Sequence, residues 1–494
     1  MKPVSKLMLS IVIPLCAFCA CNQNPENRFA KARSEIEKLM EAKGIASFQV
    51  AVAKDGKMIY EEAFGWANVK KRIPATNETM YLVASIEKPF ISTALMIMAE
   101  RGKIDLGAPI NNYLGKNKLI ANRGSAADAT VTRLLLHVSG MAYGYYISSE
   151  SFPREKRRSN SDLMELAGVL VYPPGTVYEY TNYGYGLLDE IVERAAGGDL
   201  KEFVTKEVIS PLGLAHTTYF KSQPPEELIA TQNINDGTLP VFLGLYSTAG
   251  DLARFGMFHL KARLPSQETI LADSSIDLLR EYMEPGVKYT TRTIAWDVQQ
   301  DYGYQAVMHG GGGPGIHNYL YMIPSENLVI AYMSNAQYSS SSSVLVELIA
   351  AAVPGFTFVN RMKGRGWPQA PELDPRVWQG EWTGRIAGPK GSCPVAVSFN
   401  SQGIPKLRIG DGGAGEWVSP NKPVQHGGGK VCYRFDAHIP YLHSSAWHDE
   451  IVLIMKPEGS MLVGSASAAK EKNFGIDENY VLPQYIELSQ TSRR

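Results

Sequence analysis

Two groups of predicted strands that lie far apart in the sequence constrain the fold of this chain more than any other feature. Residues 48–53 and 58–64 alternate between apolar and polar side chains on either side of Asp55-Gly56, which is typical of a tight hairpin turn. Strand-like runs return at residues 319–323 and 328–333. Because the residues between the two groups show mainly helical spacing, we predict one sheet built from both ends of this segment, with helices packed on it.

Helices are predicted before, between and after these strands. Apolar residues recur at helical spacing in residues 27–43, 85–102, 163–169, 185–195, 200–209 and 344–352. Gly102 is a suitable C-terminal stop for the second of these helices. Helices and strands together define a predicted unit of mixed secondary structure over residues 27–355.

The composition changes after this unit. Residues 356–372 are rich in glycine and proline, which favours a linker. Short strand-like runs then follow with turns between them, at residues 378–385, 395–399, 407–409, 451–455 and 461–464. We therefore predict a small, mostly antiparallel β domain over residues 373–494.

Length and charge limit the classes of protein that fit the sequence. The 494 residues correspond to two or three domains at about 150 residues each. With 45% hydrophobic and 20% charged residues, the chain can bury a large core, which excludes a mainly disordered protein. Lys plus Arg and Asp plus Glu both number 49, so the net charge provides no general attraction for nucleic acid or for an anionic membrane surface.

The N-terminus predicts export. Lys2 and Lys6 precede an apolar run that is too short to span a bilayer and has the length of a secretory signal, so residues 1–20 are predicted to be a signal peptide. The end of this run resembles a bacterial lipobox, with Phe18 in place of the usual leucine. We expect Cys21 to carry lipid, which would hold the protein on the membrane at the periplasmic side of the cell envelope. The alternatives are cleavage without lipid and retention of the run as an anchor.

Five cysteines are present, and three of them fall in the signal segment or at its end. The other two, Cys393 and Cys432, lie in the predicted β domain. In an oxidising compartment they could form a disulfide, and two buried thiols are the alternative.

Ser85 and Lys88 are the first residues that point to chemistry. Their spacing on a helix places the serine hydroxyl and the lysine amine on one face, one turn apart. The first turn of a helix also favours developing negative charge. A lysine kept neutral by its surroundings can take the serine proton and so activate the serine as a nucleophile. On its own the pair is a weak signal, since the same spacing is common by chance.

Two further groups of residues strengthen this signal. Tyr180 and Asn182 lie just before the predicted helix over residues 185–195. A tyrosine with a lowered pKa can share a proton with a lysine, and an asparagine can hold a substrate amide. His309 begins a glycine-rich run, and glycines let a strand approach a ligand and offer backbone N–H groups to an oxyanion. Aromatic packing is the alternative for the tyrosine-rich stretch around Tyr180.

Taken together, these residues resemble the three motifs of the serine β-lactamase and penicillin-binding-protein superfamily. The matching pairs are Ser85/Lys88, Tyr180/Asn182 and His309/Gly311, and further matching stretches are residues 102–106, 134–140, 211–213 and 244–252. Within this superfamily, the sequence most resembles the branch that contains class C β-lactamases, DD-peptidases, D-aminopeptidases and related esterases. The resemblance covers residues 30–350 and implies an α+β fold of β-lactamase type, with helices packed on an antiparallel sheet, followed by the C-terminal antiparallel β domain.

The resemblance also implies catalytic roles. Ser85 would be the acylated nucleophile, and Lys88 and Tyr180 would form the proton-transfer pair. The backbone N–H groups of Ser85 and Gly312 would form the oxyanion hole. No metal or other cofactor is implied, and no histidine of the sequence lies in a metal-binding pattern. His137, which follows an apolar run, is interpreted as a packed residue rather than as a base.

The substrate contacts implied by the resemblance are Asn182, His309 and Gly311, and one neighbouring position departs from the usual pattern. Gly310 replaces a hydroxyl residue that helps to bind the carboxylate of β-lactams and of peptidyl-D-alanine. His309 with an unperturbed pKa of about 6.5 would carry only partial charge at neutral pH. We therefore expect an anionic carboxylate to bind poorly and neutral esters to be preferred.

The resulting prediction is an exported serine hydrolase that acts on ester or amide bonds through an acyl-serine intermediate. Its substrate would be a small molecule or a peptide, and nucleic acid is not a predicted partner. A D-amino-acid peptidase or DD-carboxypeptidase acting on cell-wall peptides, and a β-lactamase, are the enzymatic alternatives. A catalytically silent peptidoglycan-binding protein is the alternative from another class.

Overall fold

A computed structural model of the chain provides the fold. It describes residues 28–142, 160–220, 225–231, 233–234, 237–238, 244–288, 290–313, 315–336, 341–357, 373–410, 415–424, 430–442, 450–469 and 481–492. The predicted signal peptide, Cys21 and all but the first two residues of the predicted linker lie outside the described residues. Within the described ranges, no helix is both long enough and apolar enough to cross a membrane.

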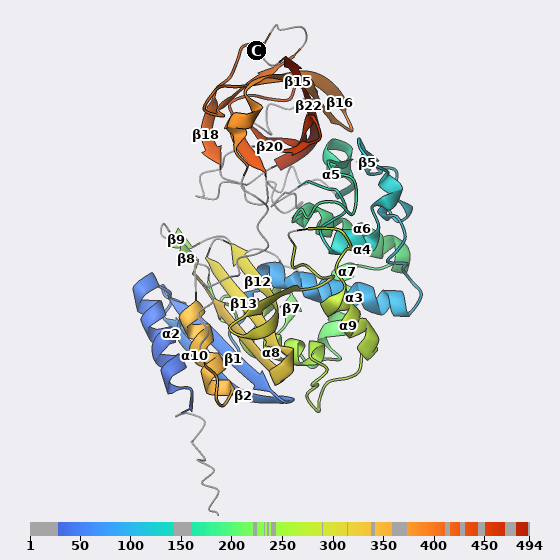
Figure 1. Cartoon of the computed structure of the whole chain (residues 1–494). Helices are drawn as coiled ribbons and strands as arrows, with labels where there is room; N and C mark the ends of the chain where they lie inside the picture. The colour runs from blue at the N-terminus through green and yellow to red at the C-terminus, as the bar shows by residue number, and fades with distance from the viewer. Residues whose placement is uncertain are drawn as a thin grey trace, which may run out of the picture.

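A seven-stranded antiparallel sheet joins the two ends of the N-terminal unit, as predicted (Figure 1). Its strand order is β11-β12-β13-β14-β1-β2-β3. The bounds are β1 Ser47–Lys54, β2 Lys57–Asn68, β3 Ile73–Pro74, β11 Asp297–Asp301, β12 Tyr304–Gly313, β13 Ile316–Ile323 and β14 Leu328–Ser334. Asp55 and Gly56 have positive φ angles of 49° and 73°, which the tight turn between β1 and β2 requires.

Helices cover both faces of this sheet. Phe48, Val50 and Val52 of β1 pack in one apolar cluster with α2 and α10, whereas Ala51 and Ala53 belong to the cluster on the opposite face, which contains α8. This alternation is what the period of two in a strand produces. The bounds are α2 Ala30–Lys43, α8 Ala249–His259 and α10 Ser342–Ala352. Figure 1 shows α2 and α10 side by side beside the sheet.

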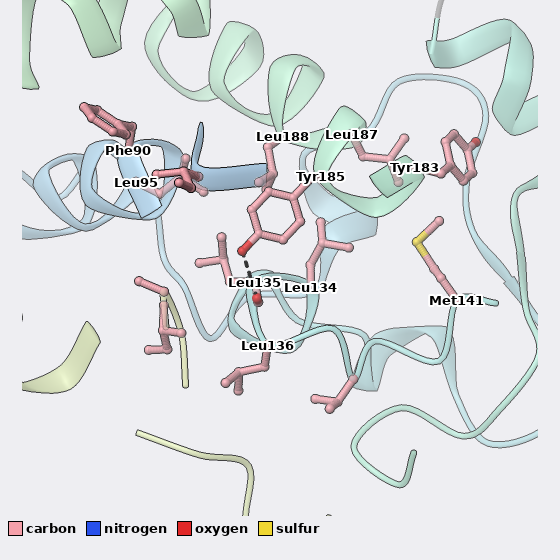
Figure 2. Close-up of a cluster of buried hydrophobic side chains, with 14 of the residues drawn as sticks. Phe90, Leu95, Leu134, Leu135, Leu136, Met141, Tyr183, Tyr185, Leu187 and Leu188 are labelled. Atoms are coloured by element: carbon pink, nitrogen blue, oxygen red, sulfur yellow. Dashed lines mark hydrogen bonds between the residues drawn. The ribbon is translucent and has the colours of Figure 1, made fainter. Parts of the chain in front are cut away.

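The remaining helices, which include α3, form the second half of the N-terminal unit (Figure 1). Their bounds are α3 Glu87–Glu100, α4 Val131–Leu135, α5 Asn160–Ala167, α6 Asn182–Ala196, α7 Leu200–Val204 and α9 Asp273–Glu281. A π-helical turn, Thr205–Ile209, continues α7. Figure 2 shows the core between α3, α4 and α6, where the hydroxyl of Tyr185 donates a hydrogen bond of 2.9 Å to the carbonyl of Leu135.

Small sheets complete this unit. The first combines β4 Tyr81–Leu82, β10 Leu245–Ser247 and β7 Thr218–Tyr219; the others pair β5 Ile120–Ala121 with β6 Val169–Leu170, and β8 Asn233–Ile234 with β9 Gly237–Thr238. Because β6 begins at Val169, the helix predicted over residues 163–169 in fact ends at Ala167.

The C-terminal part is an eight-stranded antiparallel sheet that curls into a near-closed barrel (Figure 1). Its strands are β15 Gly380–Gly388, β16 Gly391–Phe399, β17 Pro405–Ile409, β18 Pro420–Val424, β19 Val431–Phe435, β20 Glu450–Glu458, β21 Met461–Ala469 and β22 Val481–Ser492. Leu407 of β17 exchanges two backbone hydrogen bonds, of 2.9 and 2.8 Å, with Val418 just before β18. The predicted antiparallel β fold of this part is confirmed.

Cys393 and Cys432 lie in β16 and β19 as buried thiols. Of the two alternatives that the sequence left open for these cysteines, the structure shows the thiols rather than a disulfide.

Several elements were not predicted, and β12 is the most consequential of them. The sequence identified residues 310–313 only as a glycine-rich run, whereas they form the end of β12. Glycines have no side chains and therefore hide the alternation that identifies a strand. The elements α8, α9, β11, β18, β19 and β22 were also missed.

Candidate active site

Ser85 lies in a strained turn that leads directly into α3. The turn is a short 3-10 helix, Ala84–Ile86, and Ala84 has a φ of 51°, in the left-handed region that a non-glycine residue rarely adopts. Such a conformation costs of the order of 1–3 kcal/mol and persists where the surroundings enforce it. Here Val83 is held by a backbone hydrogen bond of 2.9 Å to Leu245 of β10. This contact helps to hold the strained turn, and with it Ser85, at the start of the helix.

Two side chains meet the hydroxyl of Ser85, and both were predicted from the sequence. The hydroxyl of Tyr180 donates a hydrogen bond of 2.9 Å to Ser85 Oγ, and Lys88 Nζ lies 3.4 Å from the same oxygen. Lys88 Nζ also lies 5.0 Å from the centroid of the Tyr180 ring. Residues 95 positions apart thus converge on one oxygen atom.

The amine of Lys88 is prepared to exchange protons near neutral pH. Burial and, second, the charge of Arg292 lower the pKa of Lys88 to about 7, although Glu87 acts in the opposite direction. Only 8% of Lys88 is exposed. At pH 7 a large fraction of this amine is therefore neutral and able to accept the proton of an adjacent hydroxyl.

Tyr180 differs from the expectation of a lowered pKa. Burial raises the pKa of Tyr180, and the opposing effects of Arg292 and of the hydrogen bond to Ser85 are smaller. The expectation was wrong because a buried phenolate loses its hydration. At neutral pH Tyr180 is a phenol, which can donate a proton or a hydrogen bond and is not a standing base.

His137 holds the segment that carries Tyr180. The His137 carbonyl accepts a hydrogen bond of 2.8 Å from the N–H of Glu179, and its Nδ1 lies 3.1 Å from the amide nitrogen of Thr181. Its ring centroid lies 4.3 Å from that of Tyr180. His137 is buried, as the sequence interpretation had it, and it has contacts on both sides of Tyr180.

His309 is tied to Arg292, a residue that the sequence did not reveal. His309 Nδ1 lies 2.9 Å from the carbonyl of Gly310, and Nε2 lies 2.9 Å from Arg292 Nη2. A carbonyl only accepts and a guanidinium only donates, so the imidazole carries its proton on Nδ1 and accepts at Nε2. A second proton would have to sit on Nε2, where it would point at the positively charged guanidinium of Arg292.

The charge state of His309 therefore corrects the expectation of partial charge. Burial, then the charges of Arg292 and Lys88, lower the pKa of His309 well below its usual range, despite the opposing hydrogen bond to Gly310. His309 is neutral at pH 7. The positive charge at this position belongs instead to Arg292.

Arg292 and Asp297 face one another across a tight turn. The two residues form an isolated β-bridge, and Thr293 donates a backbone hydrogen bond of 2.8 Å to Trp296. Arg292 Nη1 lies 3.1 Å from Asp297 Oδ2, and Arg292 Nη2 lies 3.3 Å from His137 Nε2. Arg292 is 2% exposed. No recognisable spacing or motif links this turn to His309, so the sequence carried no signal for it.

The glycines of β12 bring this strand against the turn that carries Ser85. A Cβ atom on Gly311 would lie 2.2 Å from the carbonyl oxygen of Val83, closer than atoms can pack. At Gly310 the nearest atom would be 3.6 Å away, on the ring of Tyr319, and at Gly312 the space is open. The backbone approach therefore requires glycine at position 311 and leaves room for side chains at the two neighbouring positions.

Asn182 is the first residue of α6, two positions after Tyr180, with Thr181 as the N-cap. Thr181 accepts a hydrogen bond of 3.0 Å from the N–H of Gly184, which explains why the helix begins earlier than predicted. In the part of the chain that the structure describes, no group of three or more His, Cys, Asp or Glu side chains is arranged to hold a metal ion.

This chain is similar to known proteins over most of its N-terminal unit. A family model described as Beta-lactamase matches residues 32–353. Protein flp of Staphylococcus aureus strain N315 is 23% identical over 322 residues, which cover 62% of this chain and 63% of that protein. The match therefore spans less than two thirds of the length of this relative.

Solved structures extend the likeness to the fold. The octameric penicillin-binding protein homologue from Pyrococcus abyssi is 22% identical, with a TM-score of 0.56 over 88% of this chain and 97% of that chain. EstCE1, described as a hydrolase with promiscuous acyltransferase activity, is 18% identical, with a TM-score of 0.53 over 66% of this chain and 99% of that chain. At such identities the likeness concerns the fold.

Proposed function

The chain belongs to the beta-lactamase family, and from that premise we propose that it is a serine hydrolase that works through an acyl-serine intermediate, with a preference for neutral esters. One observation carries the proposal: the Ser85 hydroxyl lies between the Tyr180 phenol, at 2.9 Å, and the amine of Lys88, at 3.4 Å, whose pKa is about 7. A nucleophile beside a base of near-neutral pKa is the arrangement that acyl transfer needs.

In the proposed first step, Ser85 Oγ bonds to the acyl carbon of the substrate. The Ser85 proton passes to neutral Lys88, and the substrate carbonyl oxygen takes up negative charge. The N–H groups of Ser85 and Gly312 would stabilise that charge, as preorganised donors do in an oxyanion hole. The close approach of β12 to the turn before Ser85 supports this pairing of donors.

In the following steps, the bond from the acyl carbon to the leaving group breaks. The leaving oxygen takes a proton from Tyr180, which recovers one from the Lys88 ammonium. Water then attacks the acyl-serine, its proton is taken by the same pair, and Ser85 Oγ is released with a proton. This route uses Tyr180 as a neutral phenol, which agrees with its raised pKa.

The preference for neutral esters rests on three features near His309. Gly310 has no hydroxyl, His309 is neutral, and the guanidinium of Arg292 is buried against Asp297 and two imidazoles. A substrate carboxylate would therefore lack a hydrogen bond to a charged group, which is worth about 1.5–3 kcal/mol. Asn182, at the start of α6, is proposed to contact the substrate next to the scissile bond.

One observation favours a second candidate, an enzyme acting on carboxylate-bearing substrates such as D-peptides or β-lactams. Arg292 brings a permanent positive charge to within 2.9 Å of His309. If the guanidinium can turn from Asp297 toward a substrate, it would replace the missing hydroxyl and charge.

A substrate panel separates these candidates. Purified protein would be assayed with p-nitrophenyl esters, D-alanyl peptides and a chromogenic cephalosporin. We expect the largest kcat/KM for the esters. A larger kcat/KM for either carboxylate-bearing class would support the second candidate, whereas no turnover and no labelling by a fluorophosphonate would indicate a silent binding protein.

A further inference from the structure

The segment that carries Tyr180 is held from two sides. Residues 173–180 form neither helix nor strand. On one side, two of their N–H groups donate backbone hydrogen bonds to the segment that follows α4: Gly175 to the carbonyl of Val138 (2.7 Å) and Glu179 to the carbonyl of His137 (2.8 Å). On the other side, the Glu179 carboxylate forms an ion pair with Lys430. Lys430 belongs to the C-terminal barrel and immediately precedes β19.

This ion pair differs from two other ion pairs that the described residues form between the two parts. The side chains of Lys430 and Glu179 are 10% and 4% exposed. In the pair Lys390–Glu165 the values are 37% and 49%, and in Arg123–Glu458 they are 26% and 36%. Charges removed from water interact more strongly, and loss of one partner leaves a costly uncompensated charge. Lys430–Glu179 is therefore the pair best able to fix a backbone position.

Apolar packing joins the barrel to the residues just before this segment. Tyr485 of β22 and Ala387 of β15 pack with Val169, Val171 and Tyr172 in one apolar cluster across the contact. The Tyr172 ring also lies beneath two barrel lysines, with its centroid 5.8 Å from Lys430 Nζ and 4.7 Å from Lys456 Nζ. Tyr172 directly precedes residues 173–180, and Glu179 lies at their other end. The barrel therefore contacts this segment at both ends.

We propose that Lys430 is a positioning residue of the active site: through its ion pair with Glu179, the C-terminal barrel fixes the segment that places the Tyr180 hydroxyl against Ser85. Glu179 and Tyr180 are adjacent, so a shift of the carboxylate is transmitted to the phenol by one peptide unit. A misplacement of about 1 Å can cost on the order of 100-fold in rate. The inference rests on the proposed function, because it concerns the rate of acyl transfer at Ser85.

The test compares Lys430→Met with Lys390→Met, a matched control that makes the same change in an exposed ion pair of the same contact. For a p-nitrophenyl ester, we expect Lys430→Met to lower kcat at least tenfold with KM within about twofold of wild type, because orientation rather than binding is lost. Lys390→Met should leave both constants within about twofold. Lys430→Arg keeps the charge and should recover most of kcat. A Lys430→Met enzyme that behaves like Lys390→Met would overturn the proposal.

A double variant covers the case in which Lys430→Met unfolds because Glu179 is left buried and unpaired. In Glu179→Gln/Lys430→Met neither charge remains, so we expect this protein to fold. Its kcat should be as low as that of the slower of the two single variants, Glu179→Gln and Lys430→Met, because both single variants and the double variant lose the same interaction. A double variant with wild-type kcat would contradict the proposal. If both variants are unfolded at the assay temperature by circular dichroism, the pair is structural and the proposal fails.

Labelling distinguishes these outcomes from failure of the proposed function. Wild-type protein should be labelled by a fluorophosphonate at Ser85. If it is not, the proposed function fails and the role of Lys430 falls with it. If wild type is labelled and the rate of labelling is the same in Lys430→Met, only the role of Lys430 is refuted.

Discussion

At the residue scale, the site depends on the buried amine of Lys88, whose pKa is lowered to about 7. The first cause of its lowered pKa is burial and the second is the nearby guanidinium of Arg292. Glu87, which would favour the ammonium form, has the smallest effect of the three. Lys88 can therefore be a base at neutral pH, a role that an exposed lysine with a pKa near 10.4 could not fill.

This pKa predicts the pH dependence of the reaction. The neutral form of Lys88 is the active one, so kcat/KM should rise with pH through a midpoint near pH 7 and fall tenfold per unit well below it. The measurement is the pH profile of kcat/KM for a p-nitrophenyl ester between pH 5 and 9, corrected with the Ser85→Ala variant. A profile that is level down to pH 5, or that rises only near pH 10, would argue against Lys88 as the base.

The residues that the sequence predicted and those it missed differ in how they reach the site. Ser85 and Lys88 are one helical turn apart, so their spacing alone brings them together. Tyr180 was found through its resemblance to a motif, but the direction of its pKa shift depends on burial, which no local pattern records. Arg292 reaches His309 through a turn closed by Asp297, a tertiary contact without any local signal.

At the element scale, the predictability of each segment follows from its side chains. The hairpin of β1 and β2 was predicted because its alternation flanks an Asp-Gly turn, and α2 because its apolar residues recur at helical spacing. The glycines of β12 give no alternation, although they are what lets the strand reach the turn before Ser85. The end of α5 at Ala167 could not be predicted, because the apolar residues that follow it are compatible with both a helix and a strand.

Close packing of β12 predicts a large effect for a single methyl group. Gly311→Ala should destabilise the fold by about 1–3 kcal/mol and lower kcat, because its Cβ would meet the carbonyl of Val83 and push β12 away from Ser85. Gly313→Ala is the matched control, since the nearest atom to its Cβ would be 3.6 Å away on Ile316. Thermal melting and ester hydrolysis of both variants provide the check. Equal melting temperatures for the two would contradict the backbone approach.

The neighbouring position predicts a change in substrate preference. A Cβ atom at position 310 would have only ordinary contacts, with the Tyr319 ring and the carbonyl of Asn318, so Gly310→Thr should fold and restore the hydroxyl residue that the resemblance implies at this position. We expect the ratio of kcat/KM for a neutral ester to that for a cephalosporin to fall by about 10- to 150-fold, the value of one hydrogen bond to a charged group. An unchanged ratio would place carboxylate recognition elsewhere in the site.

At the scale of the whole molecule, the N-terminal unit and the C-terminal barrel meet next to the segment that carries Tyr180. The sequence predicted the antiparallel β fold of the barrel and five of its strands, but it could not predict this contact, because the contact is formed by residues more than 200 positions apart. A barrel placed here contacts the segment that carries Tyr180, which is the observation behind the proposed role of Lys430.

Export and lipidation at Cys21 remain predictions from the sequence, and they concern the whole chain in its cell. Cys21→Ser removes the thiol that would carry the lipid, so the protein should move from the membrane fraction to the soluble fraction when the two forms are expressed in a bacterium. The activity of Cys21→Ser toward a p-nitrophenyl ester should be unchanged. The same fractionation for both forms would indicate that no lipid is attached there.

The acyl-enzyme itself is the most direct object to measure. After a brief reaction of wild-type protein with a slowly hydrolysed p-nitrophenyl ester and an acid quench, peptide mass spectrometry should find the acyl group on the peptide that contains Ser85. The Ser85→Ala variant should remain folded, carry no acyl group and lose at least about 10³-fold in kcat. Turnover that persists in Ser85→Ala, or an acyl group on another residue of the wild type, would contradict the proposed mechanism.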